Sequence, residues 1–253
     1  MPQRALSDTK ESAKLGNVAQ ATSTQPRTLS IDIGGSGCKA LVLDAEGQPI
    51  TERVRIKTPD TPTPAVVLEV LGRLAEKSGE FERVSCGFPG VVIDGVILTA
   101  VNLHPDWVGV NLAQELENLT GKPARVANDA DIQGMAVVEG KGVEMVLTLG
   151  TGMGSALFTD GRLVPNLELG HHPFRKNKTY EDCLGEAAMK EKGLKWWRKR
   201  LLEAIDLLAA IFNYRVLYIG GGNAKKIEME LPKNVKIVPN VAGLLGGIYL
   251  WKH

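Results

Sequence analysis

Short apolar runs separated by glycine turns open the chain after residue 28. Segments 29–33 (LSIDI), 38–44 (CKALVLD) and 50–58 (ITERVRIKT) predict three strands, the first two joined by the glycine turn GGSG. Three prolines then precede apolar residues at helical spacing, which predicts a helix over 65–77. A strand, a hairpin around 94–95, a helix over 112–119 and a strand that leads into a helix near 129 follow.

The same succession recurs in the second half of the chain. VLTLG (146–150), the glycine loop TGMG and SALFTDG (155–161) repeat the order strand, glycine loop, strand and turn. An amphipathic helix carries Trp197, Leu201, Ile205, Leu208 and Phe212 on one stripe. A strand over 216–220, a glycine loop, a strand over 235–239 and an apolar helix from 242 close the chain. This alternation predicts an α/β fold made of two related lobes.

Charge and cysteine content narrow the classes of protein. Thirty basic and 29 acidic side chains leave a net charge of +1, which provides no global field to recruit nucleic acid or a membrane. Cys38, Cys86 and Cys183 are too far apart in sequence for a disulfide framework or a structural zinc site, so we expect no zinc and a reducing cytoplasm.

The N-terminal segment and the apolar runs bear on targeting. No apolar run approaches the roughly 20 residues of a membrane span. Residues 1–27 are polar and lack the apolar centre of a secretory signal, so we expect a disordered leader. Order is expected to begin at Leu29.

Three glycine loops follow strands and predict phosphate binding. GSGCKA fits a dinucleotide fingerprint, but a strand follows it where that motif needs a helix, and no Walker motif occurs. A glycine-rich turn flanked by Asp32 and Lys39 can instead hold phosphate oxygens on its backbone amides, the alternative being a plain β-hairpin. The candidate residues are Gly34, Gly35, Ser36, Gly37, Gly150, Thr151, Gly152, Gly221, Gly222 and Asn223.

Asp129 lies where a predicted strand ends and a helix begins. Taken alone, this position suits a helix cap, because Asn and Asp are favoured there. A carboxylate at such a strand end also suits general-base chemistry, since transfer of a phosphoryl group to a hydroxyl needs a proton acceptor.

Several motifs together carry a resemblance to a known family. DIGGSGCK, GFPGVV, VANDAD, LTLGTGMGSALF, VPNLELGHH and IGGGN resemble the sugar kinases of the ROK (repressor, open reading frame, kinase) family. GTGMGSALFTDGRLVPNLELGH is similar to its polyphosphate glucokinase branch. The resemblance spans roughly residues 29–251.

The resemblance implies a fold and an activity. It implies the two-lobed, actin-like ATPase (ribonuclease H-like) fold with the active site in the cleft. The lobes would be 28–127, to which 241–253 return, and 128–240, and the family commonly forms homodimers. The implied reaction moves a phosphoryl group from polyphosphate, ATP or both to the 6-hydroxyl of glucose. Another hexose (mannose, fructose or an amino sugar) and a non-catalytic sugar sensor are the alternatives.

The same resemblance assigns residue roles. Asp129 would be the catalytic base, and Asn102, Asn128, Glu168 and His171 would contact the sugar, with Glu181 near its anomeric hydroxyl. Mg²⁺ would be held near Asp32 through water. The cysteine-rich zinc motif of many relatives is missing here, as it is in the polyphosphate branch.

A basic stretch from Arg175 to Arg200 bears on the phosphoryl donor. It is either a track for a long polyanion such as polyphosphate or a solvated helix face paired with nearby acids. The sequence leaves both interpretations open.

Overall fold

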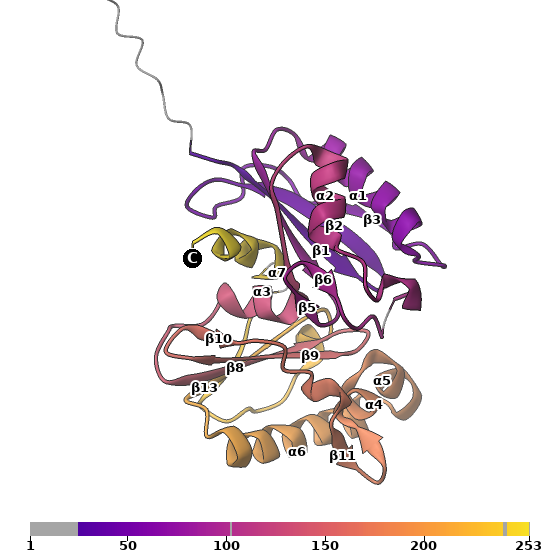
Figure 1. Ribbon diagram of the computed structural model, residues 1–253. Helices are drawn as coiled ribbons and strands as arrows, with labels where there is room; N and C mark the ends of the chain where they lie inside the picture. Colours follow the sequence, from indigo (N-terminus) through magenta and orange to yellow (C-terminus); the bar gives the residue numbers. More distant parts are fainter. Residues whose placement is uncertain (1–24, 102, 240–241, 253) are drawn as a thin grey trace, which may run out of the picture.

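The computed structural model describes residues 25–101, 103–239 and 242–252 (Figure 1). Most of the predicted leader therefore lies outside the described residues. The first strand begins at Thr28, one residue before the expected Leu29, and the backbone nitrogen of Arg27 donates to Glu82 at 2.7 Å while its guanidinium pairs with Glu82 and Glu80.

The first half of the chain builds a five-stranded sheet in the order β3-β2-β1-β4-β7. Its strands are β1 (Thr28–Gly34), β2 (Gly37–Leu43), β3 (Val54–Ile56), β4 (Arg83–Phe88) and β7 (Ala124–Asn128). Strands β1, β2 and β3 pair antiparallel, whereas β4 and β7 add in parallel. Between β4 and β7 the chain forms the small hairpin of β5 (Val92–Ile93) and β6 (Val96–Ile97) and the 3₁₀ turn η1 (Pro105–Trp107).

The second half builds a matching sheet in the order β10-β9-β8-β13-β14. Its strands are β8 (Val143–Leu149), β9 (Met153–Thr159), β10 (Arg162–Val164), β13 (Val216–Gly220) and β14 (Val235–Ile237). The antiparallel and parallel pairings occur in the same positions as in the first sheet. The topology thus confirms the repeat predicted from the two glycine loops.

One predicted strand is shorter than expected. Only Val54–Ile56 of the predicted 50–58 pairs with β2 as strand β3. Upstream, the Thr51 hydroxyl accepts the Val42 amide at 2.9 Å, and Pro49 makes only an isolated bridge to Leu43. A side chain and a proline therefore replace the regular ladder there, since proline has no N–H to donate.

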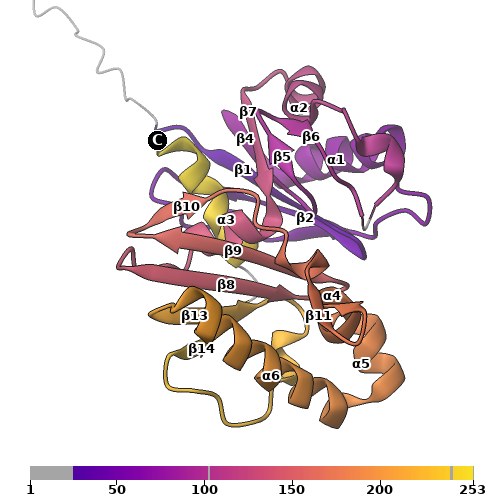
Figure 2. The same ribbon diagram turned by 60° about the horizontal axis from the view of Figure 1, so that its bottom comes forward.

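Helices cover the outer face of each sheet (Figure 1, Figure 2). Helices α1 (Pro64–Ser78) and α2 (Leu112–Thr120) lie on the first sheet and enclose a core around Leu71 and Trp107. The second sheet is covered by α4 (Tyr180–Leu184), α5 (Glu186–Lys192) and α6 (Leu194–Phe212), next to the small hairpin of β11 (Pro173–Arg175) and β12 (Lys178–Thr179). Trp197 on the predicted stripe of α6 is fully buried, and its indole donates to the Leu184 carbonyl at 2.7 Å.

Two segments lie between the sheets. Helix α3 (Asp129–Met135) contacts β8 and β9 on one side and the C-terminal helix α7 (Ala242–Leu245) on the other. After α7, the 3₁₀ helix η4 (Gly246–Trp251) runs along β1 and β4. The hydroxyls of Ser30 and Ser85 donate to the carbonyls of Leu244 and Gly247 at 2.6 and 2.7 Å. The C-terminal segment is thereby fixed to the first sheet, while the exact lobe boundaries stay a prediction.

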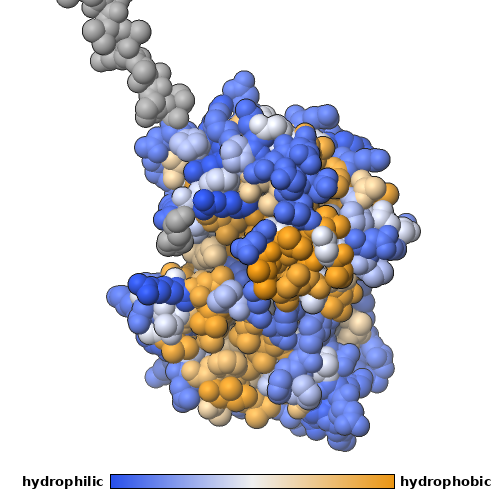
Figure 3. All heavy atoms as spheres, in the orientation of Figure 1, coloured by the Kyte–Doolittle hydropathy of each residue, from blue (hydrophilic) through white to orange (hydrophobic). Residues whose placement is uncertain are grey.

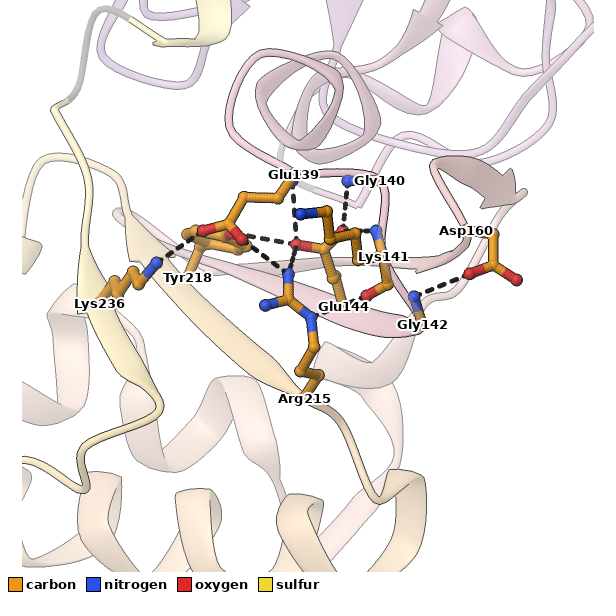
Figure 4. Close-up of polar contacts among 9 residues, drawn as sticks. All are labelled: Glu139, Gly140, Lys141, Gly142, Glu144, Asp160, Arg215, Tyr218 and Lys236. Carbon is orange, nitrogen blue, oxygen red and sulfur yellow. Dashed lines mark hydrogen bonds and ion pairs between the residues drawn. The ribbon is translucent and has the colours of Figure 1, made fainter.

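The far end of the second sheet is held by a buried carboxylate (Figure 4). Glu144, fully buried at the start of β8, accepts the backbone amides of Glu139, Gly140 and Lys141 and the hydroxyl of Tyr218. Arg215 adds an ion pair at 3.0 Å. Both oxygens of the buried Glu144 carboxylate thus accept hydrogen bonds, and these bonds offset much of the free-energy cost of removing the carboxylate from water.

None of the described helices combines the length and the apolar character that a membrane crossing needs.

Candidate active site

A central cleft of about 550 Å³ lies where the two sheets face each other. The ends of β1, β7, β8 and β13 meet there, so four segments distant in sequence share one cavity. Every predicted site residue in the described part of the chain lines it. These residues are Asp32, Gly34, Gly35, Ser36, Gly37, Lys39, Asn128, Asp129, Gly150, Thr151, Gly152, Glu168, His171, Gly221, Gly222 and Asn223. Asn102 lies outside the described residues.

The first glycine loop, residues 34–37, is the tight turn between β1 and β2. Thr58 donates to the carbonyl of Gly34 at 2.5 Å, and the Arg55 guanidinium donates to the carbonyl of Ser36 at 2.9 Å. A Cβ at position 37 would lie 2.7 Å from the Arg55 guanidinium, so a larger residue there would displace that side chain.

The second and third loops are joined to each other. The Asn223 backbone amide donates to the carbonyl of Leu149, and its side chain donates to the carbonyl of Gly150, each at 2.9 Å. Gly221 has φ +86°, and a Cβ there would overlap the Leu149 backbone. Asn223 therefore joins the second loop to the third, and Thr151 and Gly222 are the exposed residues of these two loops.

Asp129 begins α3 directly after β7, but it is not the residue that caps the helix. The cap is Asn128, whose side-chain oxygen accepts the amides of Ala130 and Asp131. Burial raises the pKa of Asp129 to about 7, with the negative charge of Asp32 as the second cause. A carboxylate poised near neutral pH is well matched to accepting a proton from a hydroxyl.

The predicted sugar-binding residues lie together on one side of the cleft. Glu168 pairs with the His171 imidazole at 3.4 Å and accepts a long contact of 3.5 Å from the Asn128 amide. Burial raises the pKa of Glu168, while the neighbouring His171 acts in the opposite direction. Asn128 also donates to the Gly90 carbonyl at 3.1 Å, so both ends of its side chain already have protein partners. Glu181 accepts the Met153 amide at 2.9 Å.

Apolar side chains border the same region. On the face drawn in Figure 3 they gather around the β5–β6 hairpin, where Ile93 and Leu98 are 46% and 44% exposed. Further along, Thr99 and Val101 line the cleft itself. Val101 thus adds an apolar side chain to the polar groups that line the cleft.

Sequence reasoning missed several residues that line the cleft: Arg53, Arg55, Gln133, Thr148, Glu186, Lys225 and Lys226. Two signals were available. Arg55 lies on β3, which pairs with β2, and Arg53 comes just before that strand; Lys225 and Lys226 lie in the 3₁₀ turn η3 (Ala224–Lys226), which follows the third glycine loop. The cations of the cleft therefore come from both sheets.

The basic side chains of residues 175–200 lie outside the cleft, although Glu181 and Glu186 of the same stretch line it. Many of its charges are neutralised within the described structure. Arg175 and Arg200 pair with Glu203, Lys190 with Glu186, Lys192 with Glu191 and Arg198 with Glu228. This arrangement favours the solvated, acid-paired interpretation over a continuous anion track.

The acidic groups of the cleft suit a magnesium ion. Asp32 pairs through Oδ2 with Lys39 at 2.6 Å and lies near enough to Asp129 to raise its pKa. Magnesium in phosphoryl-transfer sites takes one or two carboxylates, waters and the phosphates of the substrate, which is the donor set available here. Within the described residues no group of three or more His, Cys, Asp or Glu side chains forms a self-sufficient metal centre.

Fold and cleft together define a class of protein. Two sheets of identical topology with glycine loops facing a shared cleft form the actin-like ATPase architecture. Residues 28–207 match the model of the ROK family. The chain therefore belongs to the ROK family.

Individual relatives are similar over most of the chain. A polyphosphate glucokinase of Mycobacterium tuberculosis (strain ATCC 25177 / H37Ra) is 34% identical over 241 residues, which are 88% of this chain and 90% of the relative. The crystal structure of inorganic polyphosphate/ATP-glucomannokinase from Arthrobacter sp. strain KM superposes with a TM-score of 0.83 at 30% identity, over 90% of this chain and all of the other. A ROK family glucokinase from Streptomyces griseus, in complex with glucose and AMPPNP, has a TM-score of 0.75 over 88% of this chain and 98% of its own. At 19% identity it shows a shared fold only.

Proposed function

We propose that the protein is a glucokinase that transfers a phosphoryl group from polyphosphate, ATP or both to the 6-hydroxyl of glucose. The coarser class, a sugar kinase, follows from family membership and from the relatives named above. The observation that carries the proposal is the position of Asp129, a carboxylate with a pKa of about 7, in one cleft with three glycine loops.

In this reaction the chain's own residues bind, orient and take up a proton. Glu168 and His171 accept and donate hydrogen bonds to sugar hydroxyls and direct the 6-hydroxyl towards Asp129. The hydroxyl oxygen forms a bond to the terminal phosphorus, its proton passes to the Asp129 carboxylate, and the bond from phosphorus to the departing phosphate chain breaks. Backbone amides of the glycine loops and the side chain of Lys39 stabilise the phosphate oxygens. Asp32 is the residue that would hold a Mg²⁺ ion, through water, and the ion would supply further neutralisation of phosphate charge.

Different features of the cleft suit each of the two proposed phosphoryl donors, ATP and polyphosphate. A second hollow of about 490 Å³ adjoins the third glycine loop, and its wall includes Ala224, Ile237, Val238 and Pro239. Such an apolar wall suits a nucleobase and hence ATP. The cations Arg53, Arg55, Lys225 and Lys226 line the cleft and suit a longer phosphate chain.

The test is the formation of glucose 6-phosphate with each donor separately. We expect turnover with at least one of ATP and polyphosphate, dependent on Mg²⁺, and glucose to have the highest kcat/KM in a panel with mannose, fructose and N-acetylated amino sugars. A higher kcat/KM for another hexose would move the assignment to that sugar. Absence of turnover with every sugar, together with retardation of DNA at moderate salt, would favour a sugar-sensing regulator.

The oligomeric state of the protein and the cellular compartment in which it acts stay predictions. We propose a homodimer in the cytoplasm. Light scattering coupled to size-exclusion chromatography measures the mass in solution, and a mass of about 27 kDa, that of one chain, would contradict the dimer.

A further inference from the structure

Ser155 is a buried residue of β9 that has no role in the proposed reaction. It lies on the strand that directly follows the second glycine loop, and it is only 4% exposed. Its hydroxyl donates to the carbonyl of Leu167 at 2.6 Å and accepts the backbone amide of Leu169 at 3.2 Å. These two groups lie immediately before and after Glu168 in the chain. One buried hydroxyl therefore holds the backbone on both sides of the proposed sugar-binding carboxylate.

The backbone of Glu168 has the conformation that such a bridge favours. Its φ of −91° and ψ of 55° are close to those of an inverse γ-turn, in which the carbonyl before the central residue accepts the amide after it. Here the hydroxyl of Ser155 connects the same two groups. Without the hydroxyl, the chain at Glu168 would be free to relax towards the broader extended region, and the side chain would turn with it.

The carboxylate of Glu168 has only weak contacts of its own. It lies 3.4 Å from the His171 imidazole and 3.5 Å from the Asn128 amide, and both distances are long for hydrogen bonds. The side chain is 32% exposed and lines the cleft. The direction of this carboxylate therefore depends chiefly on the backbone that carries it.

The residues after Glu168 pack against the same strand. In the turn η2 (Leu169–His171), a Cβ at Gly170 would overlap the carbonyl oxygen of Met153, the first residue of β9. Ser155 lies two residues further along that strand and holds the segment that leads into the turn. Strand β9 thus supports the whole segment from Leu167 to His171.

We propose that Ser155 is a positioning residue for sugar binding: its hydroxyl fixes the backbone at Glu168 and thereby directs that carboxylate at two adjacent hydroxyls of the hexose. A carboxylate has two oxygens and can accept from both hydroxyls at once, provided that it is held in the right direction. The inference rests on the proposed function, and it adds a residue that acts on the sugar and not on the phosphoryl donor.

The first test compares wild type with Ser155→Ala, which keeps the β-carbon and removes the hydroxyl. We expect the KM for glucose to rise about tenfold, because two hydrogen bonds that orient Glu168 are lost, and the KM for the donor to change less than twofold. The matched control is Ser78→Ala at the end of α1, where another buried hydroxyl donates to a backbone carbonyl at 2.7 Å. The control should leave both KM values unchanged.

Two results of this comparison would count against the proposal. A KM for glucose in Ser155→Ala within twofold of wild type would overturn it and leave the glucokinase assignment intact. An equal rise in the KM for glucose and the KM for the donor would also overturn it, because that result indicates a general distortion of the cleft.

A double-mutant cycle with Glu168→Ala tests whether Ser155 acts through Glu168. The measured quantity is kcat/KM for glucose, which Ser155→Ala should lower about tenfold in the wild-type background. In the Glu168→Ala background no carboxylate remains to be directed, so the same change should lower kcat/KM less than twofold. An equal loss in both backgrounds would show that Ser155 merely supports the fold, and the proposal would be wrong.

A binding measurement separates this inference from the proposed function. Isothermal titration calorimetry with glucose, without any phosphoryl donor, reports binding of the sugar alone. Binding by wild type that is weakened about tenfold in Ser155→Ala supports the inference even if neither ATP nor polyphosphate serves as donor. Equal binding by the two proteins would overturn the inference and leave the proposed function intact. If wild type binds neither glucose nor another hexose of the panel, both are wrong.

Discussion

Replacement of Asp129 by asparagine should make the protein more stable and nearly inactive. In the folded protein the pKa of Asp129 is raised from 3.8 to about 7, chiefly by burial and then by the charge of Asp32. The folded state therefore holds a proton on this carboxyl more tightly than the unfolded chain does. The stability that this group contributes is fully present at low pH and falls as the pH rises from about 4 to about 7.

The expected change in the free energy of unfolding follows from the pKa shift of Asp129. One pKa unit corresponds to about 1.4 kcal/mol, so the difference between 3.8 and about 7 sets an upper limit of about 4 kcal/mol at pH 8. Asparagine keeps an oxygen for the Ala130 amide but buries an NH₂ group in exchange. We therefore expect a gain of about 2 kcal/mol at pH 8, or roughly 4–8 °C in Tm for a chain of this size. Loss of the base should lower kcat by about 10²–10⁴-fold.

The assay is urea unfolding of wild type and Asp129→Asn at pH 8, 6 and 4, with kcat measured at pH 8. The gain in unfolding free energy should be greatest at pH 8 and nearly absent at pH 4. Asp94→Asn, in the exposed β5–β6 turn, serves as the control and should show no such trend. An Asp129→Asn variant less stable than wild type at pH 8, or a gain independent of pH, would refute a buried carboxylate held at high pKa.

Three further substitutions test contacts that hold the two sheets and helix α3 in place. Burial raises the pKa of Glu144, but the hydrogen bonds to its carboxylate outweigh burial and lower that pKa below the ordinary value of 4.5. Glu144→Gln should therefore lower the free energy of unfolding in urea by about 3 kcal/mol at pH 7, and this loss should shrink as the pH falls below 4.5. A loss of the same size at pH 3 would contradict this. Trp251→Ala removes a hydrogen bond to Ser85 at 2.8 Å and stacking with two arginines. The free energy of unfolding should therefore drop by about 2 kcal/mol. An unaltered midpoint of urea unfolding would argue against a structural role of Trp251. A Cβ at Gly154 would overlap the Thr148 hydroxyl and approach Ala130 within 3.1 Å. Gly154→Ala should therefore displace the start of α3 and lower kcat about tenfold. A kcat equal to that of wild type would show that the start of α3 tolerates the change.

Patterns local in the sequence predicted an α/β fold of two related lobes and the glycine loops, whereas the actin-like architecture and the sugar-binding residues were predicted from the resemblance to the ROK family. The glycine loops could be predicted because each directly follows an apolar strand, and the duplicated order of elements placed them at corresponding ends of two sheets. Asp129 follows a strand and begins a helix, but its role as the base was predicted from the resemblance to the ROK family, because the position taken alone suits a helix cap. The strand at 50–58 was overestimated, since alternation alone does not reveal where a proline and the Thr51 hydroxyl replace backbone pairing.

Other features depend on tertiary contacts that no local pattern encodes. That Asn128 binds the sugar stays a prediction; what the fold adds is the contact of its side chain with Gly90, beside its cap of α3. Gln133 gave no signal of its own, because its place in the cleft becomes evident only when β13 is packed against α3. The basic residues of 175–200 suggested a track, but their acidic partners, including Glu203 and Glu228, are brought to them by folding.

The return of the C-terminal segment to the first sheet sets an order on assembly. Leu41 and Leu43 pack against Leu244 and Ile248, which are synthesised only after the whole second sheet. A growing chain therefore carries this apolar face of the first sheet uncovered until late in synthesis, exposed to chaperones and to other chains. We expect truncation before Ala242 to promote aggregation of the N-terminal half, even though that half retains every strand of its own sheet.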